Sequence, residues 1–218
     1  MHKIFLINTR HDAIGQCNSN ELFQIFEQIC PDIIFEEMPP SHYDAYYVHK
    51  SSKSLESEAI DKYTQAHKTK HIPIDSENMP SEEFFEDYHY MISRIEGLTD
   101  SNGFTFRNKT DLNRDYVAKY GFRYLNSNDC VKINSEINNA IEGGLKKINE
   151  EKLSQTFKSW NEAHDMRENH MLKYIYKYSS ENNFEKAIFT IGGSHRGSII
   201  KKITEFQKNE KLNLNWQY

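Results

Sequence analysis

The chain has 218 residues, a formal net charge of −5 at pH 7 and a pI near 6.1. This acidic balance argues against a nucleic-acid-binding protein, and no apolar run is long enough for a membrane span. The length allows one domain over residues 1–218. Because no signal peptide precedes the first expected strand and the cysteines lack metal spacing, we expect a reduced, cytoplasmic protein without nucleic-acid or membrane partners.

The N-terminal segment predicts a strand over residues 4–8, because it is short, apolar and rich in β-branched and aromatic side chains. Asn18, with Glu21 three residues later, resembles a capping box that begins an amphipathic helix. The loop between strand and helix therefore holds His11 just past the end of the strand.

A second strand over residues 32–35 runs directly into two carboxylates, Glu36 and Glu37. Successive side chains of a strand point to opposite faces, so only one of the two is expected to aim at a given pocket. The alternative is that the strand has already ended and both are solvated. A third short strand, over residues 72–75, ends in Asp75, at the same edge as Glu37 if the strands are parallel.

The middle of the chain is polar and gives weaker signals. Helices are expected over residues 55–67 and 81–96. Residues 97–135 hold glycines and many Asn and Asp residues, so we interpret them as the least regular part, either a cap or lid over the pocket or a connecting excursion. Ser135 is expected to cap a helix that is interrupted or bent at Gly143 and Gly144. Three scattered histidines are interpreted as surface residues: His49, His67 and His71.

A long helix over residues 150–179 carries an apolar stripe, and His164 and Arg167 continue its spacing. A buried guanidinium must be paired, because burying an unpaired charge is costly. Arg167 is therefore expected to reach a carboxylate or a substrate oxyanion at the sheet edge. The alternative is that the helix runs past the sheet there and the side chain reaches water.

The stretch over residues 187–198, A-I-F-T-I-G-G-S-H-R-G-S, predicts a strand, a glycine-rich turn and a helix. It repeats the pattern I-F-x-I-x-x-x-H of the N-terminal strand, so His195 is held past a strand end as His11 is. Glycines allow close backbone approach, and a new helix directs N–H groups at a ligand. The residues expected to contact a substrate are Arg10, Asp75, His164, Gly193, Ser194 and Arg196. The alternation over residues 212–218 predicts an edge strand.

Strands interleaved with helices predict an α/β fold: a central, mostly parallel sheet flanked by helices, with an irregular or helical insert between the third strand and the C-terminal half. The expected site lies at the carboxyl edge of this sheet and gathers His11, Glu37 or Glu36, Asp75, His195 and Arg167. Imidazoles with a carboxylate suit Zn, Mn, Fe or Co, and such an ion activates water. Without a metal, the same groups can act as a general base with an anion-stabilising arginine.

A serine hydrolase is the competing interpretation of the glycine-rich turn. It is disfavoured because Arg196 stands where the G-x-S-x-G elbow requires glycine. In addition, a serine cannot easily use the histidine next to it in sequence as its base.

The order of these motifs resembles a superfamily that groups the TraB and Tiki proteins, the ChaN-like haem-associated lipoproteins and the erythromycin-esterase-like enzymes. Its pattern is a G-x-x-H turn after the first strand, a glutamate closing the second, an R-E/D-x-x-M helix and a second G-x-x-H turn. Residues 192–195 match the second turn, residues 167–171 match the helix, and the proline-to-glutamate spacing selects Glu37. The first turn, residues 8–11, has asparagine for the usual glycine, and residues 41–135 have no match.

The resemblance implies hydrolysis, because Tiki members are metal-dependent peptidases and erythromycin esterases open a lactone with a histidine-activated water. We therefore expect a hydrolase of peptide or ester bonds, acting on a small-molecule or peptide substrate. His11, Glu37 and His195 would bind a divalent metal (Mn, Co, Zn or Fe) or activate water directly. Arg167 would stabilise charge or orient Glu37. One alternative is a non-enzymatic protein whose pocket binds haem or a peptide signal, and another is a regulatory module that acts through residues 97–135.

Overall fold

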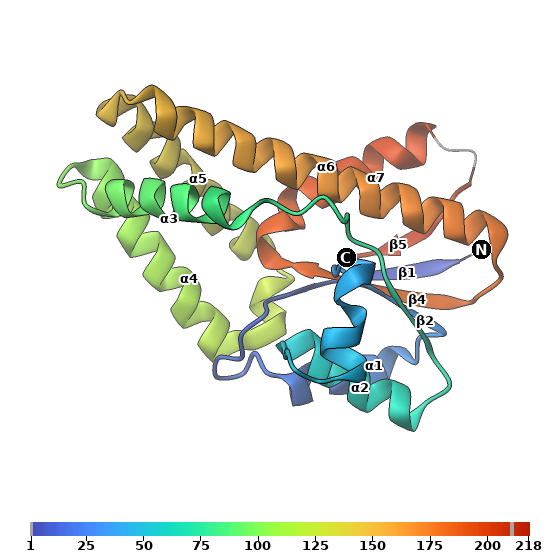
Figure 1. The fold of residues 1–218 in the computed structure, drawn as a ribbon. Helices are drawn as coiled ribbons and strands as arrows, with labels where there is room; N and C mark the ends of the chain where they lie inside the picture. Colours follow the sequence, from blue (N-terminus) through green and yellow to red (C-terminus); the bar gives the residue numbers. More distant parts are fainter. Residues whose placement is uncertain (1, 210–211) are drawn as a thin grey trace.

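The computed structural model describes residues 2–209 and 212–218, and a parallel sheet of five strands forms the centre of this described part (Figure 1). The strands are β1 (Lys3–Thr9), β2 (Ile33–Glu36), β3 (Lys70–Pro73), β4 (Lys186–Gly192) and β5 (Asn215–Gln217), in the spatial order β3-β2-β4-β1-β5. β1 pairs with β4 from Lys3 opposite Lys186 to Thr9 opposite Gly192. The two histidine turns therefore leave the sheet side by side at one edge. The predicted α/β class is confirmed.

Helices cover both faces of this sheet (Figure 1). One face carries α1 (Ser19–Ile29) and α2 (Leu55–Ala66), and the other carries α6 (Glu151–Glu181) and α7 (Arg196–Asn209). Short 3-10 turns lie at Pro40–His42 and Gly193–His195, and a π-helical turn lies at Asp44–Val48. None of the described helices combines the length and apolarity that crossing a membrane requires.

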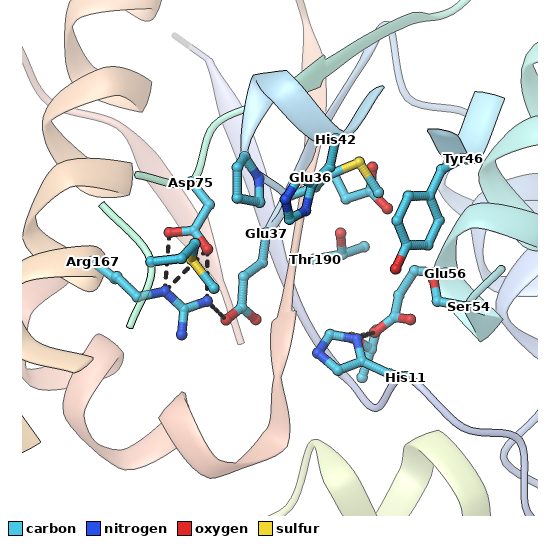
Figure 2. Close-up of a pocket in the computed structure, with 14 residues that line it drawn as sticks. His11, Glu36, Glu37, His42, Tyr46, Ser54, Glu56, Asp75, Arg167 and Thr190 are labelled. Carbon is cyan, nitrogen blue, oxygen red and sulfur yellow. Dashed lines mark hydrogen bonds and ion pairs between the residues drawn. The ribbon is translucent and has the colours of Figure 1, made fainter. Parts of the chain in front are cut away.

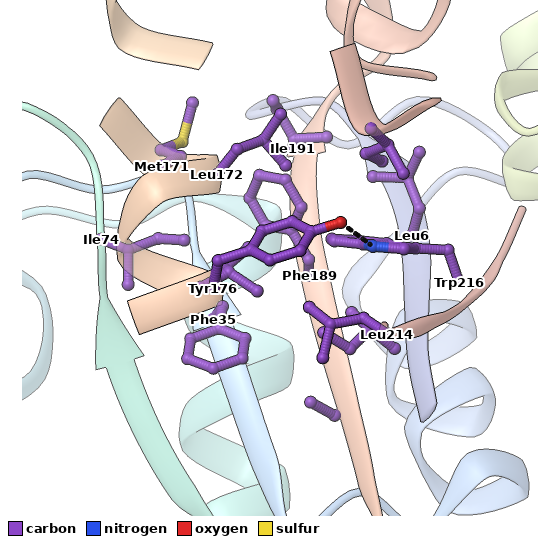
Figure 3. Close-up of a cluster of buried hydrophobic side chains, with 14 of the residues drawn as sticks. Leu6, Phe35, Ile74, Met171, Leu172, Tyr176, Phe189, Ile191, Leu214 and Trp216 are labelled. Carbon is purple, nitrogen blue, oxygen red and sulfur yellow. Dashed lines mark hydrogen bonds between the residues drawn. The ribbon is translucent and has the colours of Figure 1, made fainter. Parts of the chain in front are cut away.

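Side chains of the central strands alternate between two apolar cores, as the period of two requires. Phe35 and Phe189 face α6 and α7, in the core that Figure 3 shows, whereas Ile34 and Ile188 face α1 and α2. All four side chains are fully buried. Burial of each such side chain stabilises the fold by about 1.5–3 kcal/mol. Because the sheet is covered on both faces, β2 and β4 read as continuous apolar runs.

Most of residues 97–135 lies in helices, so the helical alternative for the insert is confirmed and the interpretation of this segment as the least regular part is wrong. The helices α3 (Glu82–Glu96), α4 (Ser101–Leu125) and α5 (Asn128–Ile148) pack with the first half of α6 around a core of their own. Figure 1 shows this bundle beside the carboxyl edge of the sheet. The glycines that suggested loops lie inside helices: Gly121 has a φ of 54° and marks a kink in α4, where a Cβ would lie 2.7 Å from the Gln16 carbonyl oxygen.

Two further details of this bundle differ from the prediction. Ser127, not Ser135, caps α5, by accepting a hydrogen bond from the Cys130 N–H. α5 is also uninterrupted at Gly143 and Gly144, where small residues let it contact its neighbours closely. A Cβ on Gly143 would lie 2.3 Å from Asn102 Oδ1 at the start of α4.

Near the ends of the chain, the predicted helix cap and the predicted edge strand are confirmed. Asn18 accepts a hydrogen bond from the Glu21 N–H and so caps α1 as predicted. β5 lies at the edge of the sheet and pairs with β1. β3 begins and ends two residues earlier than predicted, so Asp75 follows the strand instead of ending it. Asp75 nevertheless stays at the carboxyl edge.

Candidate functional site

A pocket of about 180 Å³ opens at the carboxyl edge of the sheet, past the ends of β1, β2 and β4 (Figure 2). Four residues predicted for the site line it: His11, Glu37, Asp75 and Arg167. The other lining residues are Thr9, Glu36, Met38, Pro39, His42, Tyr46, Ser54, Glu56, Met79 and Thr190. This is the position at which α/β folds bind their ligands.

Arg167 reaches the pocket from α6 and holds two carboxylates together (Figure 2). Its Nε and Nη2 donate to Asp75 at 3.0 and 2.6 Å from Oδ2, and Nη2 also donates to Glu37 Oε1 at 2.6 Å. Burial alone would lower the pKa of Arg167, but its hydrogen bonds to Asp75 and the charge of Glu37 raise it. The expectation that Arg167 reaches a carboxylate is met, and its Nη1 forms no hydrogen bond within the described residues.

His195 extends the ion pairs of Arg167 and Glu37 to a further carboxylate, Glu168. Its Nε2 lies 3.3 Å from Glu37 Oε1, and its Nδ1 lies 2.6 Å from Glu168 Oε1. Burial opposes protonation of this ring, but the charge of Glu37 and the hydrogen bond to Glu168 raise the pKa of His195 to about 9. Five residues thus form one connected unit, which we call the Arg167 network: Glu37, Asp75, Arg167, Glu168 and His195.

Glu37 lies at the centre of the network. Its Oε2 accepts a hydrogen bond from the Gly192 N–H at 2.6 Å, in addition to the contacts of Oε1. Burial works against the ionised form, yet the charges of His195 and Arg167 hold the pKa of Glu37 well below its usual range. Its side chain is buried, as is that of Glu36, so the alternative that both are solvated is wrong. Both also line the pocket, although only one was expected to face it.

His164 stacks on His195, with ring centroids 4.5 Å apart. Burial and the positive charge of His195 lower the pKa of His164 to about 4. His164 and His195 do not line the pocket in the described structure. His164 instead lines a separate cavity, together with Glu168 and Ser194.

His11 lies on the other side of the pocket from Arg167 and has its own carboxylate partner, Glu56 (Figure 2). His11 Nδ1 lies 3.4 Å from Glu56 Oε1, which also accepts a hydrogen bond from the Thr9 hydroxyl at 2.7 Å. The hydrogen bond to Glu56 raises the pKa of His11 to about 9. Because the His11 side chain is 70% exposed, water screens part of this effect. Glu56 Oε2 is buried and has no hydrogen-bond partner in the described structure.

Glu36 carries a third pair at the edge of the pocket. Its Oε2 lies 2.8 Å from His71 Nε2 and accepts a hydrogen bond from the Tyr47 hydroxyl at 2.8 Å. Burial and the Glu36 charge raise the pKa of Tyr47 well above its usual range. The His71 side chain is only 6% exposed, so its interpretation as a surface residue is wrong.

A second cavity, of about 390 Å³, adjoins the pocket and shares Thr9 and His11 with it. It is called the flanking cavity below. Three residues predicted to contact substrate line it: Arg10, Gly193 and Ser194. Arg196, another residue predicted to contact substrate, does not line the cavity: it is buried and donates from Nη1 to Asn8 Oδ1 at 2.8 Å, and its charge acts on the thiol of Cys130 in the cavity wall.

The predicted metal ligands His11, Glu37 and His195 are not arranged around a common point. Both oxygens of Glu37 already accept hydrogen bonds, and both ring nitrogens of His195 face carboxylates. A cation would have to displace Arg167 or a ring proton, so this donor set does not fit a divalent ion as arranged. Across residues 2–209 and 212–218, no three His, Cys, Asp or Glu side chains are placed to share one.

The most informative site residue that the sequence analysis missed is Glu56. It precedes Ala59, Ile60 and Tyr63 by three, four and seven residues, so it lies on the buried face of α2. A carboxylate at such a position requires a partner, as does Arg167 in α6.

No family model matches the chain, and no curated protein or solved structure is significantly similar to it.

Proposed function

We propose that the protein is a hydrolase of ester or peptide bonds, with His11 as the general base and Arg167 as the group that stabilises the oxyanion. The observation that supports this most directly is the pairing of His11 with Glu56 across the pocket from Arg167 (Figure 2). A carboxylate on Nδ1 favours the tautomer with a proton on Nδ1, which leaves Nε2 free to accept a proton. The buried carboxylate also holds the ring at the pocket wall.

The proposed step begins with a water molecule between His11 and the substrate carbonyl. His11 Nε2 takes a proton from the water, whose oxygen attacks the carbonyl carbon, and the carbonyl π electrons move to its oxygen. The resulting oxyanion accepts a hydrogen bond from Arg167 Nη1, which has no partner within the described residues. When the carbonyl re-forms, the bond to the alcohol or amine breaks, and the leaving group takes the proton from His11.

The rest of the Arg167 network acts by positioning in this proposal. Glu37 and Asp75 fix two edges of the guanidinium, so its remaining Nη1 keeps one direction. His195 and Glu168 hold Glu37 in turn. His195 is therefore a positioning residue here, whereas the sequence led us to expect a catalytic one.

We also propose kinship with the TraB, Tiki and erythromycin-esterase-like superfamily. Its supporting observation is that the motif residues contact one another: Arg167 and Glu168 of the helix motif bind Glu37 and His195, which come from two other motifs. The parallel strands alone bring Glu37 and His195 to one edge, but the direct bonds of Arg167 and Glu168 to them are additional support for the kinship.

The test is a panel of chromogenic esters and peptides assayed with wild type, His11→Ala and His67→Ala. His67 is a matched control because it also pairs with a carboxylate, Glu27, but on the surface of α1 and α2. We expect turnover to fall by about 10²–10⁴-fold in His11→Ala and to be unchanged in His67→Ala. Equal turnover in all three proteins, or none with wild type on any substrate, would contradict the proposal.

A metal requirement remains a prediction from the sequence, and the same assay tests it. Turnover that survives a chelator supports the metal-independent step. Turnover that depends on added Mn, Co, Zn or Fe supports a metal-dependent mechanism instead. The binding-protein alternative predicts saturable binding of haem or a peptide without turnover. The pocket volume of about 180 Å³ favours a small reacting group over a ligand as large as haem, since sites for drug-sized ligands span about 300–1,000 Å³.

A further inference from the structure

We propose that the flanking cavity binds an oxyanion of the substrate, a carboxylate or phosphate group, through Arg10, with Arg196 as a buried positive charge behind the cavity wall. That the anion belongs to the substrate rests on the proposed hydrolase function. The anion site itself rests on the two arginines and the cavity, so it can be tested without turnover.

Arg10 lines the flanking cavity and is half-buried. Its Nε is buried without a hydrogen-bond partner, and no carboxylate within the described residues pairs with this side chain. The one acidic residue among the described lining residues, Asp12, is exposed and pairs with neither arginine. Arg10 therefore brings a positive charge to the cavity that the protein does not neutralise.

Arg196 adds a second uncompensated charge beside the same cavity. The residue is only 5% exposed, and its Nε is buried without a partner. Its contacts are neutral: Nη1 donates to Asn8 Oδ1 at 2.8 Å and, more weakly, to Asn126 Oδ1 at 3.4 Å. Burial lowers its pKa, and its charge acts on the thiol of Cys130, a residue that lines the cavity.

Two other mostly buried cations within the described residues are neutralised by carboxylates. Arg167 has Asp75 and Glu37, and Lys202 has an ion pair with Asp165 at 2.5 Å and one with Glu168 at 3.4 Å. Buried charges in proteins are normally paired, because desolvation without a partner is costly. An oxyanion bound in the flanking cavity would supply the missing partner for Arg10 and a negative charge near Arg196.

The position of the cavity fits the proposed reaction. Because it shares Thr9 and His11 with the catalytic pocket, a substrate can place its reacting carbonyl in the pocket and its anionic end in the cavity. Asn134 and Ser194 add polar groups to the cavity wall. The substrate class that this geometry selects is an ester or peptide that carries an acidic group near the bond to be cleaved.

The experiment is a calorimetric titration with inorganic phosphate and with acetate, at constant ionic strength set by chloride. It compares wild type, Arg10→Gln, Arg196→Gln and a control, Arg114→Gln, whose side chain is 62% exposed and pairs with Asp111 on the surface. We expect saturable binding in wild type and Arg114→Gln, weakened about tenfold or more in the other two. Tighter binding of phosphate indicates a phosphorylated substrate, and tighter binding of acetate a carboxylate.

Absence of saturable binding in wild type, or equal binding by all four proteins, overturns the proposal. Arg10 is half-buried, so Arg10→Gln keeps the test valid if Arg196→Gln fails to fold. A second measurement addresses Arg196 directly. Without anion, the denaturation midpoint of Arg196→Met is expected to fall much less than that of Arg167→Met, because only a neutral acceptor, Asn8 Oδ1, loses its donor. A fall as large as that of Arg167→Met would show that Arg196 is structural and would remove it from the site. Since neither measurement involves turnover, a failed hydrolase assay leaves both results interpretable.

Discussion

Two buried arginines at the same edge of the sheet have opposite electrostatic surroundings. Arg167 is held by Asp75 and Glu37, and through Glu37 it joins His195 and Glu168. Arg196 contacts only neutral amide oxygens within the described structure and leaves Nε unpaired. The difference teaches that burial alone does not reveal what an arginine does. Two carboxylates fix the Arg167 guanidinium and leave only Nη1 for a substrate, whereas Arg196 has no carboxylate and keeps a positive charge for an anion.

Replacing the two arginines separately is the strongest test of this difference. Arg167→Met is expected to lower the free energy of unfolding by about 3–5 kcal/mol, because Asp75 and Glu37 would stay buried without their partner. The control is Arg94→Met, whose Glu150 partner is 41% exposed and whose loss should cost about 0–1 kcal/mol. Urea denaturation measures both free energies of unfolding. Similar losses in the two variants would contradict the claim that the ion pairs of Arg167 with Asp75 and Glu37 stabilise the fold.

The pH dependence of stability should report the same network, with an effect on the order of 2 kcal/mol. The pKa of Glu37 is lowered, so its contribution is present above about 4.5, the unfolded value, and is lost as the pH falls. The pKa of His195 is raised to about 9, so its contribution is full below 6.5 and is lost as the pH rises toward 9. Stability should therefore be highest between these limits.

A variant assigns the alkaline part of this profile. His195→Gln should reduce the loss between pH 6.5 and about 9, to which the exposed His11 adds a smaller part, whereas His67→Gln, on the surface, should retain it in full. Chemical denaturation at several pH values is the measurement. An unchanged alkaline slope in His195→Gln would show that the ring is not held protonated by its two carboxylates.

The smallest expected effect belongs to Arg196. Arg196→Met should lower the free energy of unfolding by about 1 kcal/mol or less in the absence of anion, since removing the desolvation cost of a buried charge offsets the hydrogen bond that Asn8 Oδ1 loses. Added phosphate or acetate should stabilise wild type and leave the variant unaffected. Denaturation with and without anion checks this, and a loss comparable to that of Arg167→Met would make the two arginines alike.

The sequence was most informative where a charge interrupts an apolar pattern. Arg167 in the stripe of α6 and Glu37 after β2 could be identified in this way, and the repeated strand pattern correctly brings His11 and His195 to one edge. Glu56 follows the same rule in α2 and was overlooked. The partner of each histidine could not be predicted, because it depends on side-chain directions: His11 pairs with Glu56, and His195 pairs with Glu37 and Glu168.

The helical bundle of α3, α4, α5 and the first half of α6 is the region where the sequence was least informative. Its glycines and polar residues suggested irregular chain over residues 97–135, but α4 and α5 form because they pack on each other and on α3 and α6. Gly121 does mark a real irregularity, a positive φ within α4, and packs against Gln16 of the loop that follows His11. Tertiary packing outweighed local propensity here, and sequence periodicity alone does not record such packing.

The proposal that His11 is a base supported by Glu56 is tested most directly by the pH dependence of kcat/KM. For wild type, kcat/KM should rise with pH to a plateau, with a midpoint between 6.5 and about 9, because only neutral His11 accepts a proton. In Glu56→Gln the midpoint should move toward 6.5, since the charge that raises the pKa is removed. A profile that is identical in wild type and Glu56→Gln, or that persists at full rate in His11→Ala, would contradict the account.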